Sequence, residues 1–289
     1  MIITPKFVVL NFPKTGSTFV RTVLKEIEQK QTRSLFERLA YMTGLKQRPF
    51  QELKCPNIKS RMPSERQIFD QHGTYEQVPL KYRELPVVSV ARNPFDRYVS
   101  VFEFRFWARI SVADLTRIRN VFPTFPDLSF AEYLDYCDYQ MAEHRIPDIK
   151  PKTELGSQTV FFIQMFFKDP RRTLTRIDEE FITSGAYKHE MPKLHLLRTE
   201  SLNQDLYNYL ITMGYPSRDI EFIINRKKIQ PPAGTNRTPD RKWQDYYSPE
   251  LMQRVCRKEK LLLKMFADFG VGEPDSWADV PGSSTIKSG

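Results

Sequence analysis

The stretch that decides the fold is KFVVLNFPKTGSTFVRTVLKEIEQK, which spans Lys6–Lys30. It predicts a buried strand at 7–10, a short loop and then a helix, because apolar residues recur at helical spacing from Phe19 to Ile27. Such a loop aims backbone N–H groups and the positive end of the helix dipole at one point. We therefore expect an anion site, although a turn with one capping hydroxyl is the simpler interpretation. The loop residues are Lys14, Thr15, Gly16, Ser17 and Thr18.

A second strand–loop–helix unit lies at Leu85–Trp107, LPVVSVARNPFDRYVSVFEFRFW. Its valine-rich run, 87–90, is typical of a central parallel strand. Asn93 is suited to cap a helix and Pro94 to occupy its first position. The apolar residues that then recur at helical spacing, and that we expect to form its buried stripe, are Phe95, Val99, Phe102 and Phe106. Two units of this kind predict an α/β fold with a central parallel sheet flanked by helices.

The rest of the chain adds helices and shorter strands. We expect a strand near Ile68 and Phe69, and another at 194–200 that is followed by a helix. Residues 111–188 are predicted to be helical, and a further helix at 248–270 begins at a capping serine. No repeat or domain boundary is visible, so we expect a single domain over residues 1–280 and a flexible tail at 281–289.

The composition excludes several classes of protein. With 289 residues, 40% hydrophobic and 27% charged, the chain is typical of folded globular proteins. The net charge of +9 favours an anionic partner, although a solvated basic surface explains it as well. The three cysteines form no C-x-x-C pair, which argues against a disulfide framework or a zinc site. No apolar run approaches the ~20 residues that span a bilayer, so we expect a soluble, cytoplasmic protein.

The first loop differs from the nucleotide-triphosphate loop, whose pattern is G-x-x-x-x-G-K-[ST]. In PKTGST the upstream glycine is missing and the lysine precedes Gly16 instead of following a glycine. The second strand ends in Arg92, where that class carries a magnesium-binding acid. The sequence therefore disfavours a kinase or ATPase, but it is still compatible with a phosphate site.

Two motifs resemble those of the sulfotransferases, which use the donor 3′-phosphoadenosine 5′-phosphosulfate (PAPS). FPKTGSTFV, Phe12–Val20, resembles the family's 5′-phosphosulfate-binding loop, and VARNPFDRYVSVFEF, Val90–Phe104, resembles its 3′-phosphate motif. The resemblance implies the P-loop-like sulfotransferase fold, PAPS as the cofactor and no metal. It also implies that the donor is bound by Lys14, Thr15, Gly16, Ser17, Thr18, Phe19, Arg92 and Ser100.

The spacing within the second motif supports this assignment. If the helix begins at Pro94, Ser100 lies roughly 9 Å further along the axis, beside the buried stripe. Arg92 at the strand end and Ser100 on the helix then approach one anion from two sides. The alternative interpretation is that the arginine forms a salt bridge and the serine is an unrelated surface residue.

Two residues are the candidates for catalysis. Sulfuryl transfer is similar to phosphoryl transfer, in which positioning and electrostatics supply most of the catalysis. By the resemblance, Lys14 contacts the bridging oxygen of the donor. For the base we choose His72 in DQHGTY, because histidine titrates near neutrality and carbohydrate sulfotransferases place their base in a similar segment. Asp70 and Glu76 are alternative bases, and a structural turn histidine is the simpler interpretation.

The loop at 225–242 corresponds in position to the segment that closes over the donor in this family. We expect Arg237 and Thr238, together with Lys242, to reach the 3′-phosphate or the adenosine. The R-K-G triplet of the animal cytosolic branch is absent, and Thr199 stands where that branch has an adenine-side tyrosine. These departures favour a bacterial or carbohydrate-type sulfotransferase.

No motif identifies the acceptor. We expect transfer to a hydroxyl or amine of a small polar metabolite or natural product, such as an alkaloid, with a saccharide hydroxyl as the alternative. Two other classes stay open, a small-molecule kinase and a nucleic-acid-binding protein, and only the +9 charge favours the latter. We expect no nucleic-acid or membrane partner, and the sequence leaves the oligomeric state open.

Overall fold

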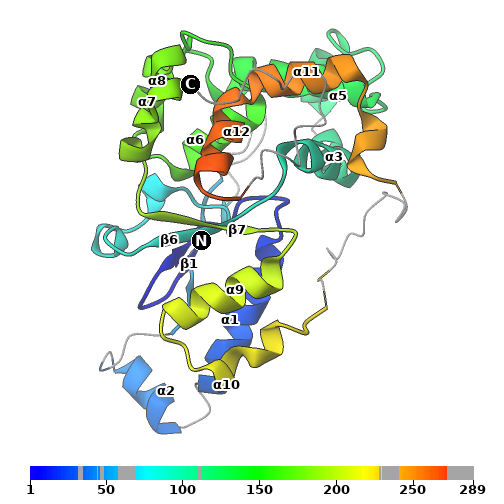
Figure 1. Ribbon diagram of the computed structural model, residues 1–289. Coiled ribbons are helices and arrows are strands. Elements are labelled where there is room, and N and C mark those ends of the chain that lie inside the picture. The colour runs from blue at the N-terminus through cyan, green and yellow to red at the C-terminus, as the bar shows by residue number, and fades with distance from the viewer. Residues whose placement is uncertain are drawn as a thin grey trace. The chain divides into compact units, whose positions relative to one another are not determined.

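The computed structural model describes residues 1–31, 35–43, 45, 49–57, 69–109, 112–227, 229 and 241–271. These residues form two compact units, and each unit is assembled from several segments of the chain (Figure 1). The first unit contains the described residues within 1–57, 69–92 and 192–232, and the second contains those within 93–191 and from 241 onwards. The single domain expected for residues 1–280 stays a prediction, and the tail at 281–289 lies outside the described residues.

The first unit is built on a mixed sheet, whose described strands follow the order β3-β1-β2-β6-β7. Strands β2, β6 and β7 run parallel, with Val8 paired to Val87 and Ala91 paired to Arg198. Strand β1 runs antiparallel to both β2 and β3, and the sequence did not predict β1 or β3. The expected α/β fold is confirmed, with an antiparallel addition at one side. The strands are β1 (Ile2–Ile3), β2 (Val8–Val9), β3 (Gln51–Glu52), β6 (Val87–Ala91) and β7 (Leu194–Arg198).

A separate two-stranded sheet carries the strand expected near Ile68 and Phe69. It pairs β4 (Cys55–Pro56) with β5 (Phe69–Asp70) in antiparallel fashion. Phe69 is in a strand as predicted, whereas Ile68 lies outside the described residues. The small sheet therefore ends just before the candidate base, His72.

Helices α1 and α9 form the main core of the first unit with the large sheet (Figure 1). Val9, Val88 and Leu197 of the strands pack with Val23 of α1 and Leu206 of α9, and all five are at most 3% exposed. The amphipathic helix expected after the first loop is thus confirmed, and its apolar stripe is what binds it to the sheet. The helices of this unit are α1 (Ser17–Gln31), α2 (Leu35–Met42), α9 (Leu202–Thr212) and α10 (Ser217–Ile220).

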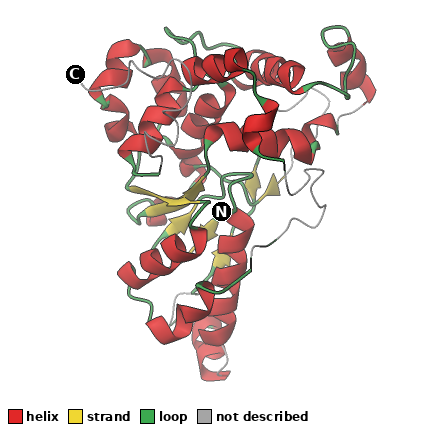
Figure 2. Ribbon diagram, turned by 45° about the vertical axis from the view of Figure 1, so that its right-hand side comes forward, coloured by secondary structure: helices red, strands yellow, loops and turns green. Residues whose placement is uncertain are grey.

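The second unit is helical in its described part, as the red ribbons of Figure 2 show. Its core is rich in aromatic side chains; for example, Phe95 stacks on Trp243 with their ring centroids 5.3 Å apart. The apolar run at 160–167 is buried in α6, so these residues belong to the core. The helices are α3 (Pro94–Phe104), α4 (Val112–Arg119), α5 (Phe130–Gln140), α6 (Ser157–Phe166), α7 (Pro170–Arg176), α8 (Glu179–Ser184), α11 (Pro249–Lys258) and α12 (Lys260–Asp268).

Helix α3 begins where the sequence predicted and ends earlier. The Asn93 side chain accepts hydrogen bonds from the backbone N–H groups of Phe95 and Asp96, at 2.8 and 3.4 Å. The helix stops at Phe104, because Arg105 adopts a left-handed backbone with φ 52°. Phe106 was expected on the buried stripe of this helix, and that expectation was wrong, since the residue lies beyond the helix and is 49% exposed.

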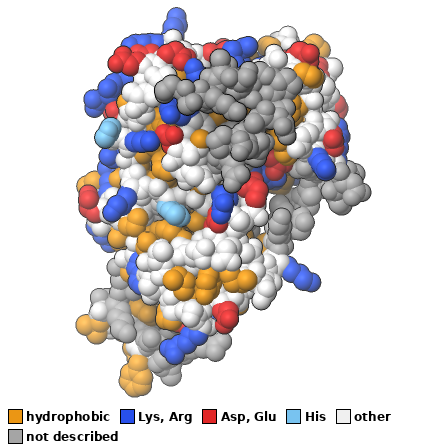
Figure 3. Space-filling model, viewed as in Figure 1, with side chains coloured by type: hydrophobic (Ala, Val, Ile, Leu, Met, Phe, Trp, Pro, Cys, Tyr) orange, Lys and Arg blue, Asp and Glu red, His pale blue; other side chains and the backbone are white. Residues whose placement is uncertain are grey.

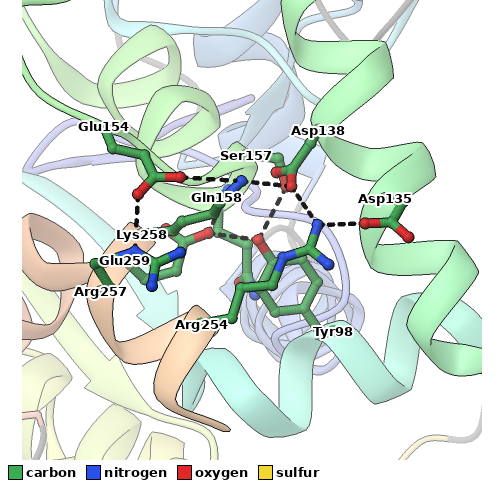
Figure 4. A network of polar contacts seen from close by, with 10 residues as sticks. All are labelled: Tyr98, Asp135, Asp138, Glu154, Ser157, Gln158, Arg254, Arg257, Lys258 and Glu259. Carbon is green, nitrogen blue, oxygen red and sulfur yellow. Dashed lines mark hydrogen bonds and ion pairs between the residues drawn. The ribbon is translucent and has the colours of Figure 1, made fainter. Parts of the chain in front are cut away.

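A buried carboxylate interrupts the helix that was expected to run unbroken over 248–270. Glu259 separates α11 from α12 and is fully buried (Figure 4). Its carboxylate accepts hydrogen bonds from the backbone N–H groups of Gln158 and Thr159, at 3.0 and 2.7 Å, and one from the Tyr98 hydroxyl, at 2.5 Å. A carboxylate at the start of α6 is favoured by the helix dipole. Burial nevertheless raises the pKa of Glu259 above its ordinary value.

Candidate functional site

The candidate site begins where three parallel strands of the first unit end. β2, β6 and β7 have their carboxyl ends at one edge of the sheet, which is where ligands bind in open α/β sheets. The loop that joins β2 to α1 starts at this edge, and Arg92 and Thr199 directly follow the other two strands. We call residues 13–18 the anion loop.

The backbone of the anion loop adopts two left-handed residues. Lys14 has a φ of 66° and Gly16 a φ of 101°. A Cβ atom on Gly16 would lie 2.9 Å from the Cδ2 atom of Leu202 in α9, so a larger residue would both strain the backbone and collide with that helix. Glycine is therefore required for the loop to pack this closely, with α1 starting directly after it at Ser17.

The hydroxyl side chains of the loop do not all face the same way. Thr15 is fully buried, and its hydroxyl donates to the backbone oxygen of Phe12 at 2.8 Å. Ser17 is 7% exposed, Thr18 is half-buried and Phe19 packs in the core. The Thr15 side chain thus stabilises the loop itself. The N–H of Phe19 in α1 donates to the Gly16 oxygen at 2.9 Å, so the N–H groups of Ser17 and Thr18 are the donors that the start of α1 offers by its geometry.

The second motif reaches the first one through Arg92. Its Nη1 atom donates a hydrogen bond to the backbone oxygen of Lys14 at 3.2 Å. Both residues belong to the first unit and are half-buried. The two segments expected to bind phosphate therefore meet at one place, 78 residues apart in the sequence.

Thr199 is a third residue at this place, and its contact with the loop was not predicted from the sequence. Its Oγ1 atom lies 2.7 Å from the backbone oxygen of Thr15 and 2.7 Å from that of Ala91. Its backbone N–H also donates to the Ala91 oxygen, at 2.9 Å. The sequence analysis expected Thr199 inside a strand at 194–200, whereas the strand ends at Arg198.

His72 is held next to the anion loop by the end of β2. Its Nδ1 atom lies 2.7 Å from the backbone oxygen of Asn11, which precedes the loop by two residues. A carbonyl oxygen only accepts hydrogen bonds, so Nδ1 carries the proton, and we assign Nε2 as the basic nitrogen of the neutral ring. The side chain of Asn11 donates in turn to the backbone oxygen of Gln71 at 3.1 Å. These contacts fix both the position and the tautomer of the histidine.

The alternative bases have other contacts. The Asp70 carboxylate accepts from the backbone N–H of His72, at 2.7 Å, and from the side chain of Asn57. It therefore shapes the turn that carries His72. Glu76 is exposed in a short 3-10 helix that follows, and its backbone oxygen accepts from Arg83 at 2.7 Å.

A comparison with protein families decides the identity of this region. Residues 4–145 match the family model of the sulfotransferase domain, and the match includes the anion loop, His72 and Arg92. Residues 4–145 are therefore similar to a sulfotransferase domain, which supports a sulfotransferase family for this chain. A search of curated proteins gave no match to this chain.

For three of the predicted site residues, the structure gives no position relative to the anion loop. Ser100 is half-buried in α3 and belongs to the second unit, so its pairing with Arg92 stays a prediction. Arg237 and Thr238 lie outside the described residues, as does most of the loop at 225–242.

In the part of the chain that the structure describes, no group of three or more His, Cys, Asp and Glu side chains is arranged to hold a metal ion. None of the described helices is both long and apolar enough to cross a membrane. On the face seen in Figure 3, the described Lys and Arg side chains are interspersed with Asp and Glu.

Proposed function

We propose that this sulfotransferase moves a sulfuryl group from PAPS to a hydroxyl or amine of a small polar metabolite or natural product. The contact between Arg92 and the Lys14 backbone is the observation that carries the proposal. An arginine and a loop at a helix N-terminus each suit a phosphate, and together they suit a ligand with two phosphate groups. PAPS is such a ligand.

The residues present fit the donor by their chemistry. The anion loop combines the N-terminus of α1, a glycine with φ 101° that allows close approach, and the lysine before it. We assign the 5′ end of the donor to Lys14, Thr15, Gly16, Ser17, Thr18 and Phe19, with Thr15 contributing through the backbone because its hydroxyl donates to the Phe12 oxygen. We assign the 3′-phosphate to Arg92 and Ser100, with Arg237 and Thr238 as further candidates.

Three roles follow for the residues of the chain. The bound donor supplies an activated sulfuryl group with a phosphate as its leaving group. The Lys14 ammonium stabilises negative charge on that phosphate, a role that a metal ion has in phosphoryl transfer. His72 accepts the proton of the acceptor at Nε2, because the Asn11 carbonyl holds the proton on Nδ1. Arg92 holds the donor, so we expect it to affect donor affinity more than the chemical step.

The acceptor is proposed only by class. A small polar metabolite or natural product, for example an alkaloid, is our first choice, and a saccharide hydroxyl is the alternative. A bacterial or carbohydrate-type enzyme is likewise a proposal, which rests on the missing R-K-G triplet and on Thr199. A cytoplasmic location is a separate proposal.

One assay separates the proposal from the kinase alternative. The protein is incubated with PAPS and a mixed panel of hydroxyl, amine and saccharide acceptors in excess EDTA, and formation of 3′,5′-bisphosphoadenosine (PAP) is measured. We expect acceptor-dependent PAP formation that Lys14→Ala lowers strongly. ADP formation from Mg-ATP with the same panel, without any turnover of PAPS, would contradict the proposal.

A further inference from the structure

We propose that Thr199 is a positioning residue of the anion loop, whose hydroxyl sets the affinity of the loop for the 5′-phosphate side of the donor. The inference rests on the proposed function and adds a residue to it. The resemblance places Thr199 where the animal cytosolic branch contacts adenine, which is a different part of the donor.

The hydroxyl of Thr199 lies between two segments that are far apart in the sequence. It is 2.7 Å from the Thr15 oxygen in the loop and 2.7 Å from the Ala91 oxygen at the end of β6. The backbone of Thr199 is itself fixed, since its N–H donates to the Ala91 oxygen at 2.9 Å. The side chain therefore holds the loop at a set distance from the ends of β6 and β7, within a single unit.

Two successive loop carbonyls are held from within the protein. The Lys14 oxygen accepts from Arg92 at 3.2 Å, and the Thr15 oxygen lies 2.7 Å from the Thr199 hydroxyl. We assign the single hydroxyl proton to the Thr15 oxygen, because the Ala91 oxygen already accepts from the Thr199 N–H. In a planar trans peptide the N–H group points opposite to the carbonyl. The N–H groups of Thr15 and Gly16 therefore point away from Arg92 and Thr199, respectively.

This orientation is what an anion site needs. Successive N–H groups in a backbone with left-handed residues form the concave arrangement that binds anions, and left-handed residues are present at Lys14 and Gly16. Without the Thr199 hydroxyl, the Thr15 carbonyl loses a donor and the peptide unit that presents the Gly16 N–H is less firmly oriented. The 5′-phosphate side of the donor is then the part that loses affinity.

The test compares two nucleotides and three variants by isothermal titration calorimetry. PAP carries both phosphates, whereas adenosine 3′-monophosphate lacks the one that the anion loop would bind. Thr199→Val removes the hydroxyl at nearly constant shape, and Thr199→Ser keeps it. Thr212→Val is the matched control, because the Thr212 hydroxyl donates to the Tyr209 oxygen within its own helix, α9.

We expect Thr199→Val to weaken PAP binding about tenfold, as for the loss of one hydrogen bond, and to leave adenosine 3′-monophosphate within about twofold. Thr199→Ser and Thr212→Val should bind PAP within about threefold of the wild type. If Thr199→Val does not fold, Thr199→Ala carries the same expectation.

Two results would overturn the inference, and they differ from failure of the proposed function. Unchanged PAP affinity in Thr199→Val would mean that the hydroxyl does not position the loop. Equal weakening of both nucleotides would mean a general structural role. A wild-type protein that binds no PAP would instead remove the proposed function, and this inference with it.

Discussion

The Nη1 atom of Arg92 donates a hydrogen bond to the backbone oxygen of Lys14, at 3.2 Å. The two residues come from the two strand ends at which the sequence predicted phosphate-binding motifs. Their contact brings these two segments together in the first unit, where we propose that the donor binds. It also means that Arg92 has two expected functions, since it orients the loop and is assigned to the donor.

Lys14 is expected to lower the stability of the fold and to be required for turnover. Its φ of 66° lies in the left-handed region, which costs a non-glycine residue roughly 1–2 kcal/mol. We predict that Lys14→Gly is more stable than Lys14→Ala by about 1 kcal/mol, while both lose at least about 100-fold in turnover. Urea denaturation and PAPS turnover check the two parts. Lys193→Ala, an exposed lysine of the first unit, is the control and should keep full turnover.

His72→Ala is expected to lower turnover by about 10²- to 10⁴-fold, the usual range for a general base, while PAP affinity stays within about threefold. The reason is that His72 contacts Asn11 next to the loop and is assigned to the acceptor proton, not to the donor. Steady-state kinetics and calorimetry measure the two effects. His189→Ala, an exposed histidine of the second unit, should change neither. Turnover near the wild-type rate in His72→Ala would show that another residue is the base.

Gly16→Ala is expected to be more damaging than Gly270→Ala. Both glycines have positive φ, at 101° and 66°, so each substitution strains the backbone. Only at Gly16 would the new Cβ meet a neighbour, Leu202 at 2.9 Å, whereas nothing lies within 4 Å at Gly270. We predict a loss of about 1–3 kcal/mol in Gly16→Ala, together with loss of PAP binding. Gly270→Ala should cost less and bind PAP normally, and equal losses in the two variants would contradict the packing argument.

Glu259 is expected to make stability depend on pH. Burial raises its pKa above the ordinary 4.5, so the folded chain binds this proton more tightly than the unfolded chain does. Its contribution to the free energy of unfolding is therefore lowered as the pH rises from about 4.5 through the folded value, and it is constant above that. Glu259→Gln removes this slope.

The measurement for Glu259 is the difference in unfolding free energy between wild type and Glu259→Gln at several pH values. As the pH rises, the free energy of unfolding of the wild type should fall relative to that of Glu259→Gln. Glu250→Gln is the matched control on α11, because hydrogen bonding lowers the pKa of Glu250 and gives a slope of the opposite sign. A pH-independent difference for Glu259→Gln would show that the buried group does not titrate in this window.

The parts of the fold that were predicted from the sequence are those with a local pattern. The valine-rich run of β6 and the apolar stripe of α1 each reflect burial of their own segment. Strand β1 has only two residues, which is too short for any periodicity to appear. No glycine or proline in the sequence signals the break between α11 and α12. The break lies at Glu259, whose position depends on contacts with α6, a segment far away in the sequence.

The candidate site likewise contains residues that were predicted from the sequence and contacts that were not. The anion loop and Arg92 were predicted because each lies in a strand-to-helix junction that is visible in the sequence. The contact of Thr199 with Thr15 was not, because it joins residues 184 apart. The inward direction of the Thr15 hydroxyl was missed for a similar reason, since only the turn geometry brings it to Phe12.

The most direct test of the central claim is calorimetric titration of PAP into the wild type, Arg92→Ala and the control Arg218→Ala, an exposed arginine of the first unit. The account predicts micromolar binding to the wild type and to Arg218→Ala, and a loss of about 100-fold or more in Arg92→Ala. A folded wild-type protein that binds no PAP, or an Arg92→Ala variant that binds it as tightly as the wild type, would contradict the account.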